Sequence, residues 1–157
     1  MADYDPWALP ATGTVQQVGA AVWRIVAPNP SPLTGPGTNT YVVGTERPVV
    51  IDPGCDDAAH LERVLEVAGG VVSRIICTHS HPDHSPGARW LKERTGAPMH
   101  GLPAPDDGHQ DPGYAPDAGL EHGECIEAGG EALRALHTPG HASNHVCLLL
   151  EEAGLLF

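Results

Sequence analysis

Basic residues are scarce in this chain of 157 residues, which carries 8 Lys and Arg against 20 Asp and Glu. The formal charge of −12 leaves no basic patch or tail that would hold nucleic acid through its phosphates alone. The charge does not exclude a nuclease whose metal ions hold the phosphate, but it favours a small-molecule substrate over nucleic acid. It also gives no support for binding to an anionic membrane surface.

Long apolar runs are missing too. No segment approaches the roughly 20 apolar residues of a membrane-spanning helix. The first residues, MADYDPWALPATG, lack the basic start and the apolar stretch of a secretory signal. The chain has only four cysteines, which lie far apart and form no CxxC pair: Cys55, Cys77, Cys125 and Cys147. We therefore expect free, buried thiols in a cytoplasmic protein without a membrane segment.

Internal repeats, low-complexity tracts and linkers are absent as well, so we expect one domain over residues 1–157. Glycine and proline, with 19 and 16 residues, are nearly twice as frequent as usual and indicate many turns. Helices are predicted at residues 56–69 and 87–95. Strands are predicted at residues 14–26 (two, around Gly19), 38–44, 47–54, 71–78, 124–128, 131–137, 144–150 and 154–157.

Both predicted helices carry start signals. Asp56 or Asp57 can cap the first helix, and Ser85 with Pro86 resembles the cap and first residue of the second. The succession of strand, helix and strand around the first helix predicts a parallel crossover unit. The segment 101–122 is predicted as a long loop without Lys or Arg, and its acidic residues as a solvated face.

The heptapeptide THSHPDH places three histidines and an aspartate at the C-terminal end of a predicted strand. Pro82 excludes a helix interior at this point. In extended chain, residues two apart point to the same side, so His79 and His81 would face one point in space. Asp83 and His84 follow as the chain turns toward the second helix. Imidazole and carboxylate ligands together suit zinc, iron or manganese, and this predicts a metal site.

This heptapeptide resembles the signature of the metallo-β-lactamase superfamily of hydrolases. The segment IDPG at residues 51–54 resembles that family's first motif, and HTPGHASNH at residues 137–145 resembles its third. The segments NPSPLTGPGTNTYVVG and HTPGHASNHVCLLLEE resemble most closely the lactamase-β-like branch. That branch includes a mitochondrial single-strand endoribonuclease and many bacterial hydrolases of unassigned substrate. The proline-rich loop 27–37 resembles the family's substrate-flanking loop.

The resemblance covers nearly the whole chain, from Val15 to Phe157, and implies an α/β fold. The family fold is an αββα sandwich of four layers, of which this sequence supplies the N-terminal half and a few further strands. The family completes its pair of metals with an aspartate after the last strand and with a later histidine, and neither is present before Phe157. We therefore expect the N-terminal portion of a longer hydrolase, truncated on its C-terminal side.

The resemblance also implies roles for individual residues. His79, His81 and His141 correspond to the first metal site, and three histidines with a water also form an open catalytic zinc set on chemical grounds. Asp83 and His84 correspond to part of a second metal site. The expected cofactor is Zn²⁺, as one or two ions, with iron or manganese as alternatives.

Two further residues correspond to supporting positions. Asp52 resembles the family's buried aspartate, which orients the histidines, and His145 resembles a histidine that supports the site without binding metal. Asp83 is also the predicted catalytic residue, because its carboxylate could receive a proton. The remaining histidines show no such pattern. His137 is expected at a strand end, and four others are expected at the surface: His60, His100, His109 and His122.

The implied reaction is hydrolysis by a metal-bound hydroxide, which is available at neutral pH because zinc lowers the pKa of its water to about 7. The scissile bond would be an ester, thioester, lactam or phosphodiester. Three functions remain open: a hydrolase of small esters or thioesters, a phosphodiesterase like the single-strand endoribonuclease, and a truncated metal-binding fragment without catalysis. Iron-dependent persulfide oxidation is a further alternative, and the sequence does not indicate an oligomeric state.

Overall fold

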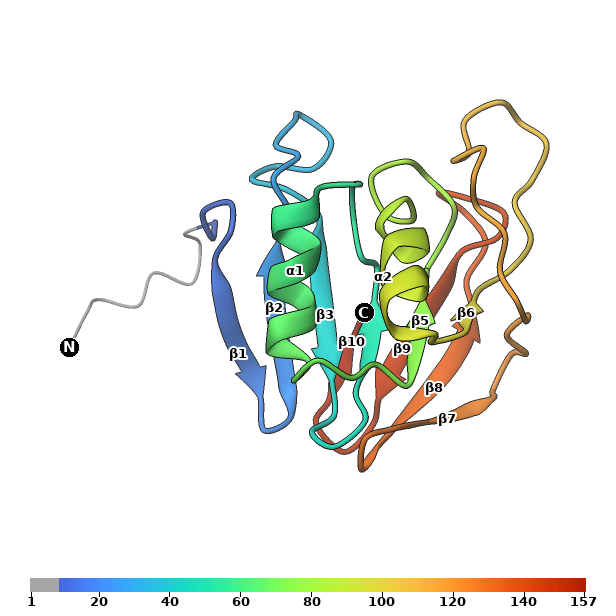
Figure 1. The fold of residues 1–157 in the computed structure, drawn as a ribbon. Helices are drawn as coiled ribbons and strands as arrows, with labels where there is room; N and C mark the ends of the chain where they lie inside the picture. Colours follow the sequence, from blue (N-terminus) through green and yellow to red (C-terminus); the bar gives the residue numbers. More distant parts are fainter. Residues whose placement is uncertain (1–8) are drawn as a thin grey trace.

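The computed structural model describes residues 9–157, which form two helices and two sheets (Figure 1). The first sheet has six strands in sequence order: β1 (Val15–Gly19), β2 (Val22–Val26), β3 (Asn39–Val43), β4 (Val49–Ile51), β5 (Arg74–Ile76) and β6 (Met99–His100). The second has the order β10-β9-β8-β7, with β7 (Cys125–Ala128), β8 (Glu131–His137), β9 (Val146–Leu150) and β10 (Leu155–Leu156). The helices are α1 (Ala58–Val67) and α2 (Gly87–Thr95).

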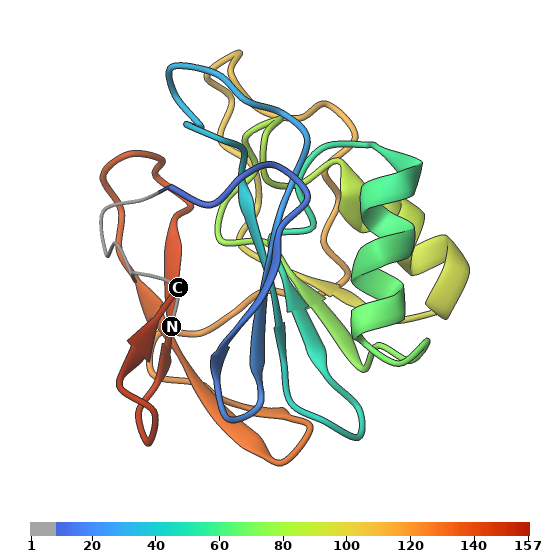
Figure 2. The same ribbon diagram turned by 90° about the vertical axis from the view of Figure 1, so that its left-hand side faces the viewer.

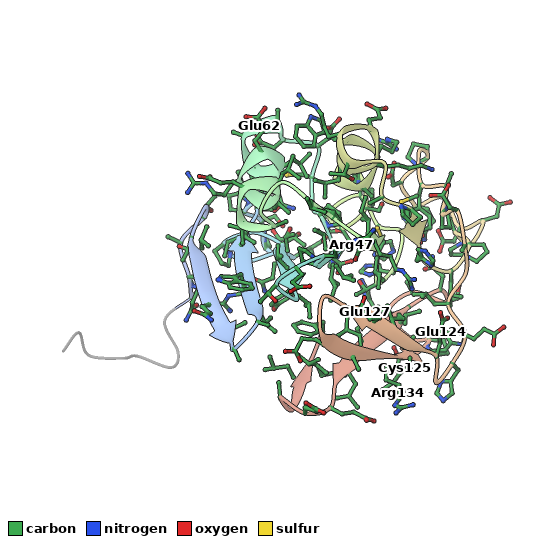
Figure 3. The ribbon with its side chains drawn as sticks, turned by 60° about the horizontal axis from the view of Figure 1, so that its bottom comes forward. Arg47, Glu62, Glu124, Cys125, Glu127 and Arg134 are labelled. Carbon is green, nitrogen blue, oxygen red and sulfur yellow. The ribbon has the colours of Figure 1, made fainter. Side chains whose placement is uncertain are left out.

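These elements form three layers: the two helices, the first sheet and the second sheet, seen edge-on in Figure 2. In Figure 3, Glu62 on α1 and Arg134 on β8 accordingly lie on opposite sides of the molecule. A helix layer followed by two packed sheets is the arrangement expected for the first part of an αββα sandwich, so the predicted fold class is confirmed.

The side chains of the central strands point alternately into two hydrophobic cores. Val50 and Ile75 point toward the helices and pack in one core with Leu61 of α1. Ile51 and Ile76 point the other way, into the core between the two sheets. Because both faces of these strands are buried, their sequences are apolar without alternation. This packing fixes the ends of β4 and β5, from which the candidate site is built.

The crossover predicted around α1 is confirmed, because β4 and β5 pair in parallel with α1 between them. The pairing sets Ile51 opposite Ile76, so both strands end at the same edge of the sheet. The chain leaves this edge through Asp52 on one strand and through residues 77–85, here called the histidine loop, on the other. Both segments lie at the upper end of the molecule in Figure 1.

The helix starts agree only in part with expectation. Asp57 caps α1, because its Oδ1 accepts a hydrogen bond from the His60 N–H at 2.8 Å. The expected cap at Ser85 is wrong: Pro86 is the N-cap residue of α2, and no side chain caps this helix. The Ser85 hydroxyl instead donates to Asp111 Oδ2 at 3.0 Å and ties the histidine loop to the long loop 101–122.

Two residues expected at the surface are buried. Asp111, within the acidic stretch, is only 6% exposed and accepts a hydrogen bond from Arg89 Nη1 at 3.1 Å. His60 is equally buried, and its Nε2 lies 3.0 Å from Pro53 O and 3.1 Å from Thr40 Oγ1. In both cases the sequence shows a polar residue, and only the fold supplies the partners that allow its burial.

Strand β6 was not predicted, since two residues give no periodicity to read. It pairs in parallel with β5 and leaves His100 half-buried rather than at the surface. All four cysteines lie within residues 9–157 and are free thiols, as expected. The expectation that they are buried holds only for Cys77, because Cys125 is exposed and Cys55 and Cys147 are partly buried. Among residues 9–157, neither helix is long and apolar enough to cross a lipid bilayer.

Candidate metal centre

Asp52 follows β4 directly and links the two strand ends. Its φ of 48° is in the left-handed region, which Asp and Asn tolerate better than other non-glycine residues. Its N–H donates to Ile76 O at 2.9 Å, so the turn remains tied to β5. The carboxylate of Asp52 is thereby buried beneath the histidine loop.

The Asp52 carboxylate organises the histidine loop through Thr78. Oδ1 accepts from Thr78 N at 2.7 Å, and Oδ2 accepts from Thr78 Oγ1 at 2.7 Å. Because the hydroxyl proton is directed to Asp52, Thr78 Oγ1 acts as the acceptor for His79 Nδ1, 3.0 Å away. This chain of bonds assigns the ring proton of His79 to Nδ1 and leaves a free lone pair on Nε2.

His79 Nε2 is buried and has no hydrogen-bond partner among the described residues. Burial, reinforced by the neighbouring His84, lowers the pKa of His79 to about 3, so the ring is neutral at physiological pH. A buried polar atom without a partner costs about 1–3 kcal/mol. A divalent metal ion satisfies such a lone pair, and the orphaned nitrogen therefore fits the expected cofactor.

Three histidines converge at this point. The ligand atoms of His79, His81 and His141 all lie within 4.8 Å of one another. His81 Nδ1 and His141 Nε2 are 3.1 Å apart. Two nitrogens bound to zinc at about 2.0–2.1 Å in tetrahedral geometry are separated by about 3.4 Å, which is close to this distance. The donor set and its spacing thus fit one metal ion, although their role as ligands stays a prediction.

His84 lies between two carboxylates. Its Nδ1 is 2.8 Å from Asp52 Oδ2, and its Nε2 is 3.3 Å from Asp83 Oδ2. Burial opposes the charged form of His84, but the two carboxylates outweigh burial and raise its pKa to about 10. The hydrogen bond from His84 in turn lowers the pKa of Asp83 to about 2. Asp83 and His84 must therefore separate before His84 Nε2 can bind an ion, and their assignment to a second metal site stays a prediction.

His145 lies close to the cluster without joining the three converging rings. Its ring centre is 5.2 Å from that of His79, and its Nδ1 is 3.0 Å from Thr138 Oγ1. Thr138 lies on the same loop as His141. This placement agrees with a supporting role for His145, which likewise stays a prediction.

The histidine cluster opens onto a cleft with a volume of about 610 Å³. Its walls come from the 27–37 loop with Leu33, from the histidine loop, from Asp107 and His109 of the 101–122 loop, and from His141. Leu33 is 96% exposed at the rim. A smaller adjoining hollow of about 330 Å³ shares Asp83 and His84 with the cleft. Clefts of this size accommodate small organic molecules.

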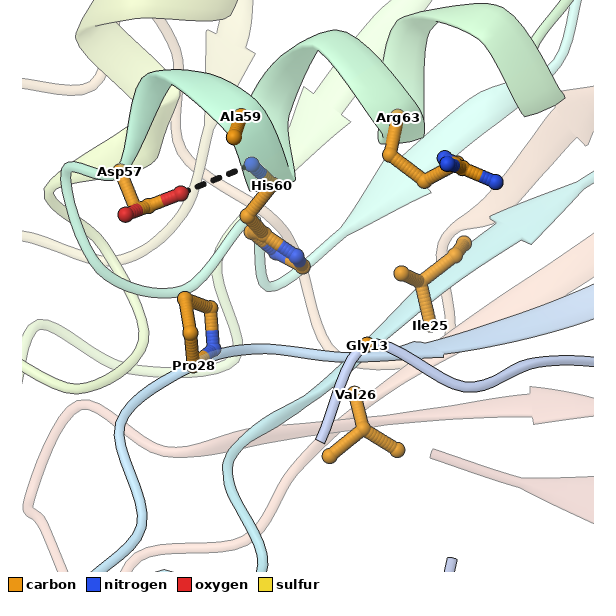
Figure 4. Close-up of a pocket in the computed structure, with 8 residues that line it drawn as sticks. All are labelled: Gly13, Ile25, Val26, Pro28, Asp57, Ala59, His60 and Arg63. Carbon is orange, nitrogen blue, oxygen red and sulfur yellow. Dashed lines mark hydrogen bonds between the residues drawn. The ribbon is translucent and has the colours of Figure 1, made fainter. Parts of the chain in front are cut away.

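A separate cavity of about 350 Å³ lies between α1 and β2 (Figure 4). Ile25, Val26 and Pro28 give it an apolar wall, and His60 and Arg63 reach it from α1. None of its lining residues belongs to the histidine cluster, and His60 already uses its Nε2 within the fold. The candidate metal site therefore lies at the cleft beside the strand ends and not at this cavity.

Sequence reasoning missed four buried polar residues around the cluster: Thr78, Ser80, Asp111 and Asn144. Ser, Thr, Asp and Asn are common in exposed turns, so their type gives no signal of burial. The one clue was position, because Ser80 stands between His79 and His81, and Asn144 stands beside His145.

Comparison with known proteins agrees with this geometry. Residues 33–157, more than half of the chain, match the family model described as the metallo-β-lactamase superfamily. An atrochrysone carboxyl ACP thioesterase of Passalora fulva is 37% identical over 153 residues, which covers 93% of this chain and 43% of that protein. A lactamase-like protein of Pestalotiopsis microspora is 35% identical over 157 residues, covering 95% of this chain and 46% of its own length. The chain thus spans a little under half the length of these curated relatives.

Solved structures share the fold at lower sequence identity. A metallo-β-lactamase mutant from Cronobacter sakazakii superposes with a TM-score of 0.70 at 23% identity, covering 94% of this chain and 62% of that one. The native FEZ-1 metallo-β-lactamase from Legionella gormanii gives a TM-score of 0.72 at 17% identity, covering 96% of this chain and 63% of that one. At these identities the comparison establishes the fold and nothing finer.

Proposed function

Because the chain belongs to the metallo-β-lactamase superfamily, we propose that it is a metal-dependent hydrolase of small thioesters or esters. The observation that carries the proposal is the convergence of His79, His81 and His141 within 4.8 Å. Three histidine ligands with one open position form a donor set typical of catalytic zinc. The Passalora fulva relative, which is named a thioesterase, supports the choice of a thioester.

The ion would be held by His79 Nε2, His81 Nδ1 and His141 Nε2, the atoms that face one another or lack a partner. When bound, zinc supplies an acidified water at neutral pH and polarises the scissile carbonyl. Iron and manganese also accept imidazole and carboxylate ligands, so the identity of the ion is part of the proposal.

The protein's own residues have separate tasks in this reaction. Asp52 and Thr78 hold His79 in the tautomer whose Nε2 lone pair is free. Asp83 lies at the wall of the cleft with its side chain 36% exposed. Its lowered pKa keeps the carboxylate ionised, so it would accept a hydrogen bond from the attacking water and orient it. His84 orients Asp83 through its Nε2, 3.3 Å from the carboxylate.

The cleft favours an acyl compound over a nucleic acid. Leu33 offers an exposed apolar side chain at the rim, which suits the organic part of an acyl group. Asp83 and Asp107 add negative charge to the walls, and the chain has no Lys or Arg between Thr95 and Ala132. A polyanion such as RNA would be repelled there. We therefore place a free or carrier-bound acyl thioester ahead of RNA.

The test is metal-dependent turnover by the purified chain. Zinc-loaded and chelator-stripped protein would be assayed with an acyl thioester of N-acetylcysteamine, a p-nitrophenyl ester and single-stranded RNA. We expect hydrolysis of the thioester and the ester that disappears on stripping and returns with zinc. His81→Ala should abolish it, whereas His122→Ala, at an exposed histidine outside the cleft, should not.

Three results would contradict the proposal. Turnover that survives both metal removal and His81→Ala would show that the cluster is not the active site. Cleavage of RNA alone would move the assignment to a phosphodiesterase. Metal binding without turnover of any of the three compounds would favour a metal-binding role for this chain.

A further inference from the structure

We propose that Asn144, Ser80 and Gln110 form a clamp that fixes the loop 138–145, which carries His141, against the histidine loop. By holding His141 in place, this clamp sets the metal affinity of the centre. The three are positioning residues, since none of them is among the converging ligands. The inference rests on the proposed function in one respect, namely that the three converging histidines bind the ion.

The hydrogen bonds of the clamp share the hydroxyl of Ser80, a residue that is fully buried. Asn144 Nδ2 donates to Ser80 Oγ at 2.8 Å, across 64 positions of sequence. Ser80 Oγ donates in turn to Gln110 Oε1. One side chain between His79 and His81 is therefore bonded both to the loop that carries His141 and to the long loop 101–122.

The bonds of the clamp all run in the same direction. Beyond Ser80, Gln110 Nε2 donates to Asp107 Oδ1 and Oδ2 at 2.7 and 2.9 Å. Hydrogen bonds aligned from donor to acceptor strengthen one another. Asp107 lies on the wall of the metal cleft, so the clamp extends from the base of the His141 loop to the rim.

His141 needs such an anchor because its own side chain is exposed. Within its loop, Asn144 is buried, and Asn144 Nδ2 also donates to Leu102 O at 3.2 Å. Asn144 Oδ1 is buried without a hydrogen-bond partner among the described residues, which is unfavourable. An apolar side chain of similar size would avoid that cost, so the amide is explained by its Nδ2 bonds rather than by packing.

The test compares zinc affinity with the stability of the metal-free protein. Ser80→Ala and Asn144→Leu each remove the clamp, and Ser73→Ala is the control. Ser73 Oγ donates to Pro48 O at 3.1 Å, just before β5 and thus at the opposite end of that strand from the histidine loop. Zinc dissociation constants would be measured by competition with a chelator. The ligand geometry would be followed by the visible absorption of the cobalt-loaded proteins. The free energy of unfolding would be measured in EDTA, which keeps the proteins metal-free.

We expect both clamp variants to bind zinc about 10–100-fold more weakly, the range typical of residues that orient ligands. Their cobalt spectra should shift, because the ligand geometry is no longer fixed. Ser73→Ala should lower the unfolding free energy while leaving the zinc affinity unchanged. The double variant Ser80→Ala/Asn144→Leu should bind zinc about as weakly as either single variant, since both act on one clamp.

Wild-type affinity in Ser80→Ala and Asn144→Leu would overturn the clamp and leave the proposed function intact. An equal loss of affinity in Ser73→Ala would also overturn it, because general destabilisation would then explain the effect. Failure of the wild-type chain to bind zinc would overturn both proposals.

Discussion

At the scale of single residues, the available ring nitrogens distinguish a candidate metal ligand from an ordinary histidine. His79 has a buried Nε2 without a partner, and His81 and His141 face each other at 3.1 Å. His84 has both nitrogens directed at carboxylates, and His60 has its Nε2 on a carbonyl. Residue type is the same in all five, so the hydrogen bonds around each ring decide its chemistry.

The first prediction separates His141 from His145. We expect His141→Ala to lower zinc affinity by more than about 100-fold, because it removes a converging nitrogen, and His145→Ala to lower it less. Both residues lie on the same loop, so each variant is a control for the other. Chelator competition measures both affinities, and the reverse order would mean that the wrong histidine is assigned.

The second prediction concerns the carboxylate of Asp52. Asp52→Asn replaces one of two acceptor oxygens by a donor, so the bonds to Thr78 and the orientation of His79 are weakened. We expect a folded protein that binds zinc about 10–100-fold more weakly. Asp57→Asn, which alters only the cap of α1, should bind zinc like the wild type. If Asp52→Asn also binds normally, Asp52 is only a turn residue.

At the scale of elements, the cleft depends on how its loops are tied to the sheets and helices. The 101–122 loop forms part of the cleft wall and is anchored through Asp111. That carboxylate accepts hydrogen bonds from Ser85 Oγ at 3.0 Å, Gly113 N at 2.9 Å and Arg89 Nη1 at 3.1 Å. The anchor joins the loop to both the histidine loop and α2.

The third prediction follows from this anchor. We expect Asp111→Ala to lower the free energy of unfolding by about 2–4 kcal/mol, because three donors lose their acceptor in a buried place. Glu151→Ala breaks the exposed pair with Arg134 and should leave that free energy nearly unchanged. Urea unfolding of the metal-free proteins gives both values. Equal effects in the two variants would show that Asp111 is no anchor.

The fourth prediction concerns helix α1, which is tied to the end of β4 by His60. Burial lowers the pKa of His60, while the Pro53 carbonyl and Asp57 oppose this shift. The unfolded chain, with a histidine pKa of about 6.5, therefore binds a proton before the folded chain does. His60 thus contributes stability above about pH 6.5 that is lost as the pH falls below it.

The free energy of unfolding of the metal-free protein, measured between about pH 7 and pH 5, would show this loss. That free energy should decline less steeply with falling pH in His60→Gln, because the glutamine side chain does not titrate in this window. His122→Gln, at an exposed histidine, is the control and should decline like the wild type. Parallel declines in all three proteins would contradict the prediction.

At the scale of the whole molecule, the candidate metal centre joins segments that are far apart in sequence. His79 and His81 follow β5 of the first sheet, whereas His141 lies between β8 and β9 of the second. An ion bound by all three would therefore connect the two sheets, and its binding energy would add to the stability of the entire fold.

The fifth prediction is that zinc stabilises the folded chain at about one ion per molecule. Free zinc at about 1,000 times its dissociation constant should add about 4 kcal/mol, which corresponds to roughly 10 °C in melting temperature for a domain of this size. His81→Ala should show almost no shift. Calorimetry with and without EDTA, together with metal analysis, measures both quantities. An unchanged melting temperature for the wild type would contradict the assignment.

The sequence by itself determined the family, the helix–sheet–sheet order and the candidate ligands. Strands β4 and β5 were readable because burial on both faces requires apolar runs, and α1 because its apolar side chains recur with helical spacing. The histidine pattern could be recognised as a candidate ligand set because its residue types and spacing are visible in the sequence. Among the helices and strands, the short strand β6 was missed and the start of α2 was wrong, since each depends on neighbours distant in the chain.

Only the tertiary structure decided which polar groups are paired. The free Nε2 of His79, the position of His84 between two carboxylates, and the burial of Asp111 and Ser80 all depend on bonds between residues far apart in sequence. A sequence gives the type of each donor and acceptor, but not the distance between them. Hydrogen bonds and metal sites are decided within a few tenths of an ångström, and that spacing arises only when the sheets and loops pack together.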